Sequence, residues 1–330
     1  MIQATTATKT PGDRARKASR VPAGNGASST SSTRRRAGRA FPYLMLAPAV
    51  LLLLLVLGVP IVRGIGMSFE HIVLTRPGEY QPFVGFDNYL RMVQEDAFWH
   101  SVGLSLYYTV GVVVGCFGIG LALALLMNRS FFARPLARAA MIVPWAVPWV
   151  AATLVWGVMY DQQFGIVNSL LNGIPFFAEM TERINWLGSD AAVMPALILV
   201  NVWNEFPIAF LMILAGLQSI DSTLYEAAKV DGANSLQTFR HITMPSMKNV
   251  NAVVILILCI WAFRRFTVIY ILTQGGPGGS SETLIIKTYQ EAFRFYDFSY
   301  GATLGVASLI FSLLFTGIYL YATKLQKAES

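Results

Sequence analysis

Apolar residues gather in six long runs, and shorter polar segments separate them. Each run is close to or above the roughly 20 residues that an α-helix needs to cross a bilayer. The pattern therefore predicts an all-α, polytopic membrane protein with six transmembrane helices. The predicted spans are Phe41–Met67, Val102–Met127, Ala139–Tyr160, Ala192–Leu217, Asn249–Thr273 and Phe298–Thr323.

Composition agrees with this class and excludes several others. Hydrophobic residues make up 55% of the chain and charged residues only 13%, whereas soluble domains carry about 25% charged residues. The two cysteines, Cys116 and Cys259, lie far apart in apolar runs, and the three histidines have no ligand spacing, so neither a disulfide nor a metal site is indicated. The sequence contains no Walker A loop and no recognisable catalytic motif, so we expect no enzyme activity in this chain.

Three segments follow from the polar regions at the ends of the chain. Residues 1–40 are rich in Ala, Ser, Thr, Gly and Arg and are predicted to be a disordered basic tail. The cluster Arg34–Arg36 with Arg39 precedes the first apolar run, which favours a topology signal over a nucleic-acid patch. That run is too long for a signal peptide and is predicted to be retained. Residues 41–325 then form the transmembrane domain, and 326–330 form a short tail.

The charge distribution predicts the orientation of the six spans. If the N-terminus lies in the cytoplasm, the tails and the two inner loops hold 17 of the 25 Lys and Arg residues. The three outer loops hold 12 of the 18 Asp and Glu residues. Because inner loops of membrane proteins are enriched in Lys and Arg, we predict that both termini and the loop between spans four and five are cytoplasmic.

That inner loop, residues 221–245, has the pattern of two short amphipathic helices. Thr223 and Glu226 are spaced as a capping box at the start of the first helix. Gly232 stands where a left-handed C-terminal cap is expected. A second helix is predicted to begin at Ser235 and to end at Pro245, which lacks an amide hydrogen. From these features alone, a helix lying on the membrane surface is an equal alternative to a docking element.

The loop resembles the EAA signature of ABC importer permeases, which reads EAA, three residues, Gly, nine residues, Ile-x-Leu-Pro. Met244 replaces the usual Leu, a substitution that conserves volume. The resemblance implies a type I ABC importer permease fold in which this loop is the coupling helix that docks in a groove of a cytoplasmic ATPase. It assigns that coupling role to Glu226, Ala227, Ala228, Gly232, Ile242 and Pro245.

Two further segments resemble the carbohydrate branch of these permeases, the maltose- and glycerol-phosphate-type proteins. Residues 215–220 match the lead into the EAA loop, and residues 272–277 are similar to a Leu-Thr-Gly-Gly-Gly-Pro stretch, with Gln274 as the departure. The resemblance covers residues 41 to 325. It implies uptake of a di- or oligosaccharide across a bacterial plasma membrane.

The same resemblance implies a set of partners. A second permease subunit would form a heterodimer with this chain, and an extracytoplasmic solute-binding protein would deliver the solute. Two ATPase subunits would use ATP and Mg²⁺, while this chain itself would hold no cofactor. Membrane lipid is an expected contact, and nucleic acid is not.

Other functions remain as alternatives at this point. The same architecture could import glycerol 3-phosphate or another phosphorylated polyol, for which paired arginines would suit the phosphate. A secondary transporter should show internal repeats and ion-coupling sites, and an intramembrane enzyme should show a catalytic constellation. The sequence displays neither feature.

Charged residues inside the spans are the candidates for the substrate pathway, because such residues are costly in a membrane. Glu205 lies in span four, while Arg264 and Arg265 lie in span five. Glu205 could pair with one arginine inside the bundle, or the group could contact solute hydroxyls beside an aromatic ring such as Phe263, and both can hold together. The pathway candidates are Asn201, Trp203, Asn204, Glu205, Trp261, Arg264 and Arg265.

Proline and glycine mark two further features of the spans. Pro144 and Pro148 are predicted either to kink span three at the pathway or to adjust its packing. Glycines in span two invite the close approach of another helix, and packing is the favoured interpretation. They are Gly111, Gly115, Gly118 and Gly120.

Overall fold

The computed structural model describes residues 45–75, 78, 83–129, 131–174 and 183–328. The predicted tail 1–40, the start of the first span and the last two residues lie outside these ranges. The chain divides into two compact units, Met1–Val59 and Pro60–Ser330. In the first unit the described residues are helical and include a π-helical turn, η1 (Leu54–Gly58).

In the described part of the second unit the regular elements are helices, joined by turns and loops, and one isolated β-bridge links Val73 and Asp297. This confirms the all-α prediction. Its elements are α2 (Val59–Met67), α3 (Asp87–Gln94), α4 (Asp96–Asn128), α5 (Arg134–Ala146), α6 (Trp149–Met159), α7 (Ile166–Asn172), α9 (Asp190–Gln218), α10 (Ser222–Val230), α11 (Ser235–Thr238), η3 (Phe239–Thr243), α12 (Met244–Ser246), α13 (Lys248–Phe263), α14 (Thr267–Leu272), α15 (Leu284–Tyr289), η4 (Gln290–Arg294) and α16 (Phe298–Ala328).

Five helical stretches are long and apolar enough to cross a membrane: Met45–Met67, Asp96–Asn128, Asp190–Gln218, Lys248–Leu272 and Phe298–Tyr321. The pair α5 and α6 raises the number to six if it counts as one span, but its two helices meet at 92°. The predicted span Ala139–Tyr160 therefore consists of two helices separated by a sharp bend. Of the two alternatives for Pro144 and Pro148, a kink or an adjustment of packing, the structure shows the kink.

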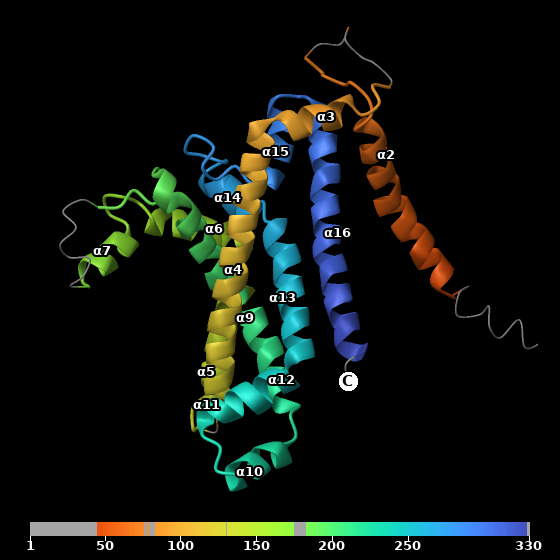
Figure 1. Cartoon of the computed structure of the whole chain (residues 1–330). Helices are drawn as coiled ribbons and strands as arrows, with labels where there is room; N and C mark the ends of the chain where they lie inside the picture. Colours follow the sequence, from red (N-terminus) through yellow and green to blue (C-terminus); the bar gives the residue numbers. More distant parts are fainter. Residues whose placement is uncertain (1–44, 76–77, 79–82, 130, 175–182, 329–330) are drawn as a thin grey trace, which may run out of the picture. The chain divides into compact units, whose positions relative to one another are not determined.

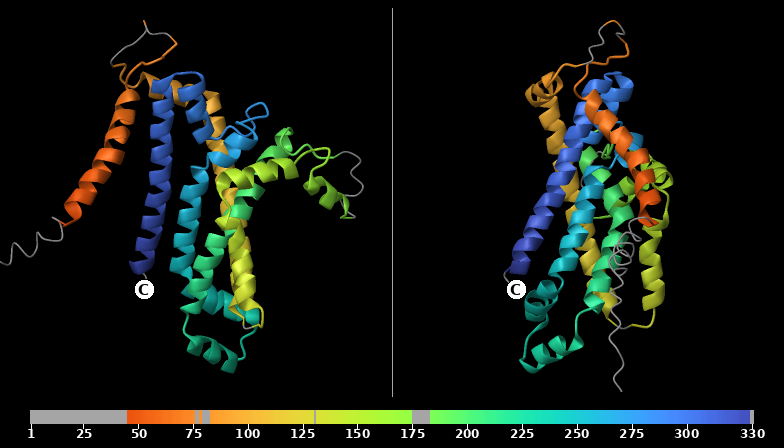
Figure 2. Two further views of the ribbon diagram at one scale, coloured as in Figure 1. Left: turned by 180° about the vertical axis from the view of Figure 1, so that it is seen from behind. Right: turned by 90° about the vertical axis from the view of Figure 1, so that its right-hand side faces the viewer.

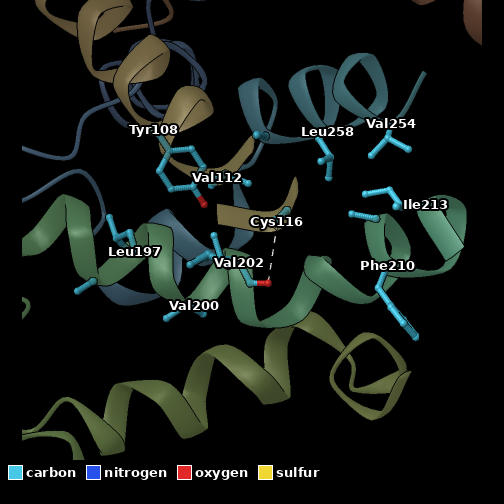
Figure 3. Packing of buried hydrophobic residues seen from close by; sticks show 14 of the residues in the cluster. Tyr108, Val112, Cys116, Leu197, Val200, Val202, Phe210, Ile213, Val254 and Leu258 are labelled. Atoms are coloured by element: carbon cyan, nitrogen blue, oxygen red, sulfur yellow. Dashed lines mark hydrogen bonds between the residues drawn. The ribbon is translucent and has the colours of Figure 1, made fainter. Parts of the chain in front are cut away.

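The core lies where α4, α9 and α13 pack side by side (Figure 1). Tyr108, Val112 and Cys116 of α4 lie against buried residues of α9, and Leu258 of α13 joins them (Figure 3). The Cys116 thiol lies 3.9 Å from the Val202 carbonyl oxygen, to which it donates a weak hydrogen bond.

Glycine allows α4 and α9 to approach this closely. A Cβ added at Gly115 would lie 2.6 Å from the Val202 side chain, and one at Gly120 would lie 2.9 Å from the Phe210 backbone nitrogen. Gly111 is similarly close to a side chain of α9, whereas a Cβ at Gly118 would meet nothing within 4 Å. The packing interpretation is confirmed for three of the four glycines and was wrong for Gly118.

The short helices gather at the two ends of the second unit. In Figures 1 and 2, α10, α11 and α12 lie beyond the ends of α4, α9 and α13, while α3 and α15 lie at the opposite end. The C-terminal part of α16 points toward the end that carries α10. Two candidate sites follow from this arrangement: an open cavity at the breaks between α5 and α6 and between α13 and α14, and the loop at the α10 end.

Candidate functional site

The bend between α5 and α6 lies between Trp145 and Trp149 and is hydrogen-bonded to α9. Pro148 has no amide hydrogen, so the Pro144 carbonyl lacks its helical donor four residues later. The Asn204 side-chain amide of α9 supplies a donor, at 2.8 Å from the Pro144 oxygen and 3.4 Å from the Val147 oxygen. Asn204 therefore stabilises the bend, and its amide is engaged by the backbone.

A second break separates α13 from α14 and carries the two arginines. The Arg265 guanidinium pairs with Glu205 of α9 and stacks on the Trp149 ring, with its central carbon 3.9 Å from the ring centroid. The other carboxylate oxygen of Glu205 accepts a hydrogen bond of 2.8 Å from Asn201. The structure thus pairs Glu205 with Arg265 and joins the α13 break to the α5–α6 bend.

These two breaks border a cavity of about 410 Å³. At the edge of the cavity, Glu205 is only 2% exposed, whereas Trp145 and Trp261 expose about half of their surface. Indole faces beside fixed polar groups form a surface typical of carbohydrate sites, since a sugar ring has apolar faces and a hydroxyl rim. The lining residues are Trp145, Trp149, Glu205, Ile260, Trp261, Arg264 and Arg265.

The sequence candidates for the pathway divide into two groups in the structure. The cavity is lined by four of them, Glu205, Trp261, Arg264 and Arg265. Asn201 does not line it but donates a hydrogen bond to Glu205. Trp203 instead packs edge-on against Trp156, with ring centroids 5.8 Å apart.

Phe263 does not reach the cavity either. It is 3% exposed and packs against Phe311 and Phe315 of α16. The suggestion that its ring could stack on a solute was wrong, because residues adjacent in a helix point in different directions.

Three cavity residues, Trp145, Trp149 and Ile260, were missed by sequence reasoning. A tryptophan in an apolar run looks like any core or lipid-facing residue. The available signal was that Trp145 and Trp149 flank the second proline of a densely broken span.

The loop at the other candidate site begins differently from the prediction. Asp221 is the N-cap of α10, and its carboxylate accepts a 2.9 Å hydrogen bond from the Thr223 amide. That hydrogen bond lowers the pKa of Asp221 below its usual value. The predicted capping box of Thr223 and Glu226 was wrong, because Asp221 occupies the capping position.

The end of α10 confirms the role of Gly232. Its φ is +75°, and the amides of Gly232 and Ala233 donate to the carbonyls of Lys229 and Ala228 at 3.2 and 2.9 Å. This double pattern is a Schellman motif, which requires a left-handed residue at its centre.

The second helical stretch starts as expected but continues further. Asn234 and Gln237 form a capping box at the start of α11 (Ser235–Thr238). Together, α11, η3 and α12 (Met244–Ser246) form one helical stretch, which ends at Ser246, one residue after the predicted end at Pro245.

The two halves of the loop enclose a groove of about 760 Å³ with the C-terminal ends of α4 and α9. The Tyr225 hydroxyl lies 3.2 Å from the Thr243 hydroxyl and joins α10 to η3. Among the residues of the EAA match, Glu226, Ala227, Gly232 and Pro245 are exposed, Ile242 is half-buried and Ala228 is buried. The exposed apolar side chains of Leu224, Val230 and Leu236 lie on the same loop.

A buried charge cluster at the opposite end was not predicted. Lys287 of α15 exposes 6% of its side chain. Its amino group lies 3.5 Å from Glu95, 3.8 Å from Glu282 and 3.6 Å from Glu291. Burial raises the pKa of Glu291, while the coulombic effect of Lys287 opposes that rise. Within the described ranges, no group of three or more His, Cys, Asp or Glu residues could hold a metal ion.

A family model and several known proteins match this chain. The family model described as "Binding-protein-dependent transport system inner membrane component" matches residues 115–325. The chain is 36% identical over 282 residues to the sulfoquinovosyl glycerol transport system permease protein SmoG of Agrobacterium fabrum, a match that covers 86% of this chain and 90% of that protein.

Two further matches extend the comparison. The trehalose/maltose transport system permease protein MalF of Thermococcus litoralis is 33% identical, with 84% of this chain and 92% of that protein covered. A crystal structure of a bacterial ABC transporter that imports alginate contains a chain with a TM-score of 0.73 and 22% identity, covering 90% of this chain and 98% of that one. The structural match supports the fold.

Proposed function

Because the chain belongs to the family of binding-protein-dependent transport system inner membrane components, we propose that it moves a carbohydrate of di- or oligosaccharide size through the cavity at its helix breaks. The chain is a multi-pass permease subunit of an ABC importer in the inner membrane. ATP hydrolysis belongs to separate subunits of such importers.

The observation that carries the proposal is the lining of the cavity. Trp145 and Trp261 offer exposed indole faces, and Glu205 with Arg265 offers a fixed polar group deep in the bundle. Aromatic faces pack on the apolar faces of a pyranose, while polar groups read its hydroxyls. The names of two relatives, which state sulfoquinovosyl glycerol and trehalose/maltose, support a glycoside as the solute class.

The proposal assigns coupling to the loop Asp221–Pro245. Its exposed surface carries Glu226, Val230 and Leu236, and an amphipathic helix of this kind suits a groove in a partner protein. The partners are two ATPase subunits that bind ATP and Mg²⁺, a second permease subunit, and an extracytoplasmic binding protein. Closure of the ATPases would move the loop and switch the cavity between its two openings.

The second candidate is import of a phosphorylated polyol, and the ion pair between Glu205 and Arg265 weakens it. That candidate used Arg264 and Arg265 together as a phosphate site. Glu205 pairs with Arg265, so of these two arginines Arg264 alone has no carboxylate partner among the described residues. A phosphate dianion would therefore meet one guanidinium that the described part of the chain leaves unpaired.

Charge reversal on the coupling loop tests the proposed function. We expect Glu226→Lys to leave the permease in the membrane while reducing ATP-driven uptake at least about tenfold. Glu226 is exposed and makes no hydrogen bond or ion pair with the described residues, so its replacement should not unfold this chain. The effect would then report contact with another subunit, and it is read as ATPase co-purification and radiolabelled sugar uptake.

A matched control and a second variant sharpen this experiment. Asp87→Lys reverses an equally exposed charge in the first turn of α3, at the other end of the bundle, and should leave coupling intact. Gly232→Pro should uncouple like Glu226→Lys, because proline cannot adopt a φ of +75°. Normal uptake and normal ATPase binding in both loop variants would contradict the coupling assignment.

The proposal also fixes the orientation of the chain, with both termini and the coupling loop in the cytoplasm. In a background without Cys116 and Cys259, a cysteine at Gln94 should react with an impermeant thiol reagent on spheroplasts. A cysteine at Ser235 should react only after the membrane is opened. Both positions are exposed in this chain, so accessibility reports the side of the membrane. Labelling of position 235 in sealed spheroplasts would reverse the orientation.

A further inference from the structure

The cavity holds three ionisable side chains, and only two of them compensate each other. The charges of Glu205 and Arg265 are paired, and the remaining carboxylate oxygen of Glu205 is bound by Asn201. Arg264 borders the same cavity and is exposed. Among the described residues Arg264 has no carboxylate partner, so the cavity carries one uncompensated positive charge.

An isolated guanidinium within a membrane span is costly. Arg264 is at the C-terminal end of α13, where the helix breaks and the cavity opens. Such a charge normally lies beside a counter-charge or a water-filled path. Arg264 borders two such spaces, this cavity and a more apolar one of about 450 Å³ beside α16, and Trp145, Trp261 and the ion pair line the first of them.

Two aromatic rings border the same space and remain available. Trp261 precedes Arg264 by three residues, a spacing that brings two side chains to one helix face. Trp145 approaches from α5. The face of Trp149, in contrast, is covered by Arg265. A ligand in this cavity would therefore meet two free indole rings and one free guanidinium.

We propose that Arg264 binds an anionic group, a carboxylate or a sulfonate, on the transported carbohydrate, so that the importer selects acidic glycosides over neutral ones. This inference rests on the proposed function. A planar guanidinium binds such oxyanions with two parallel hydrogen bonds. A single free cation matches a singly charged group better than a phosphate dianion.

A matched pair of sugars tests the inference on the complete transporter, with both permeases and the ATPases in lipid nanodiscs. The probes are a radiolabelled disaccharide that ends in glucuronic acid and the same disaccharide ending in glucose. We expect the wild type to bind the acidic sugar about tenfold more tightly. Arg264→Gln should reduce that ratio to below about twofold by weakening the acidic sugar alone, and Arg264→Lys should retain part of the preference.

Two outcomes would overturn the inference. Equal affinity of the wild type for the two sugars would show that the charge of Arg264 does not select the ligand. A failure of Arg264→Gln to co-purify with the second permease, while Arg264→Lys co-purifies normally, would identify Arg264 as an ion pair between the permeases. Both outcomes differ from failure of the proposed function, because the Glu226→Lys experiment measures coupling and does not depend on the charge of the sugar.

Discussion

Replacement of Glu205 by Gln is expected to lower the amount of assembled transporter several-fold, and addition of Arg265→Gln is expected to restore part of it. Glu205 is 2% exposed and the Arg265 side chain 15% exposed. Removal of one member of a buried pair leaves an uncompensated charge, which costs about 3–5 kcal/mol. Removal of both members leaves two neutral amides, and Asn201 can still donate a hydrogen bond to the amide oxygen at position 205.

The double-mutant cycle separates this pairing from direct contact with the solute. Abundance in the membrane and ATPase co-purification are measured for Glu205→Gln, Arg265→Gln and the double variant. Pairing requires non-additive losses, with a coupling of at least about 1 kcal/mol between the sites. Arg264→Gln serves as the control, since Arg264 has no carboxylate partner among the residues that the structure describes. If all variants assemble normally and only uptake changes, the pair acts on the solute alone.

The sequence was sufficient to predict the position of five membrane-spanning helices, because their length and apolarity are local properties. The bend of 92° in the third span was not predictable from the same pattern. Pro148 indicates that the helix breaks there, but the angle depends on what satisfies the freed carbonyl. Here the donor is Asn204, 60 residues further along the chain.

The site residues show a similar limit. The cost of charges in a membrane correctly identified Glu205 and the two arginines as candidates. Either arginine was a possible partner for Glu205. Packing decided between them, because the helix ends at Phe263 and the break directs Arg265 toward α9 and Trp149. Arg264, the adjacent residue, consequently remains free. The start of α10 differs for a more local reason: Asp221 and Thr223 can both cap a helix, and the sequence does not distinguish them.

The charge cluster around Lys287 was missed because it lies in polar segments between the predicted spans. Charged residues in such segments are ordinary, and burial depends on segments far apart in the chain. Glu95 precedes α4, Glu282 follows the glycine-rich loop after α14, and Glu291 belongs to η4. Only their convergence on one amino group identifies the cluster.

Replacement of Lys287 by Met is expected to destabilise the purified transporter by roughly 2–4 kcal/mol. Methionine has a similar length and fills the same space, so the loss would come from charge. Three carboxylates would then lie close together around an apolar side chain. Their partial exposure to water, 32% for Glu95 and 23% for Glu282, places the expected value below that of a fully buried cluster. The measurement is thermal unfolding of the complete complex in detergent.

Arg91 provides the matched control, because it forms a shorter ion pair that is more exposed. Its guanidinium lies 2.9 Å from Asp297, but 51% of the Arg91 side chain is exposed. If burial rather than distance determines the contribution, Arg91→Met should cost about 1 kcal/mol or less. Adding Glu291→Gln to Lys287→Met should recover part of the stability, since it removes the most buried of the three carboxylates. Equal losses from Lys287→Met and Arg91→Met would contradict this account, because solvent screening would then make no difference between them.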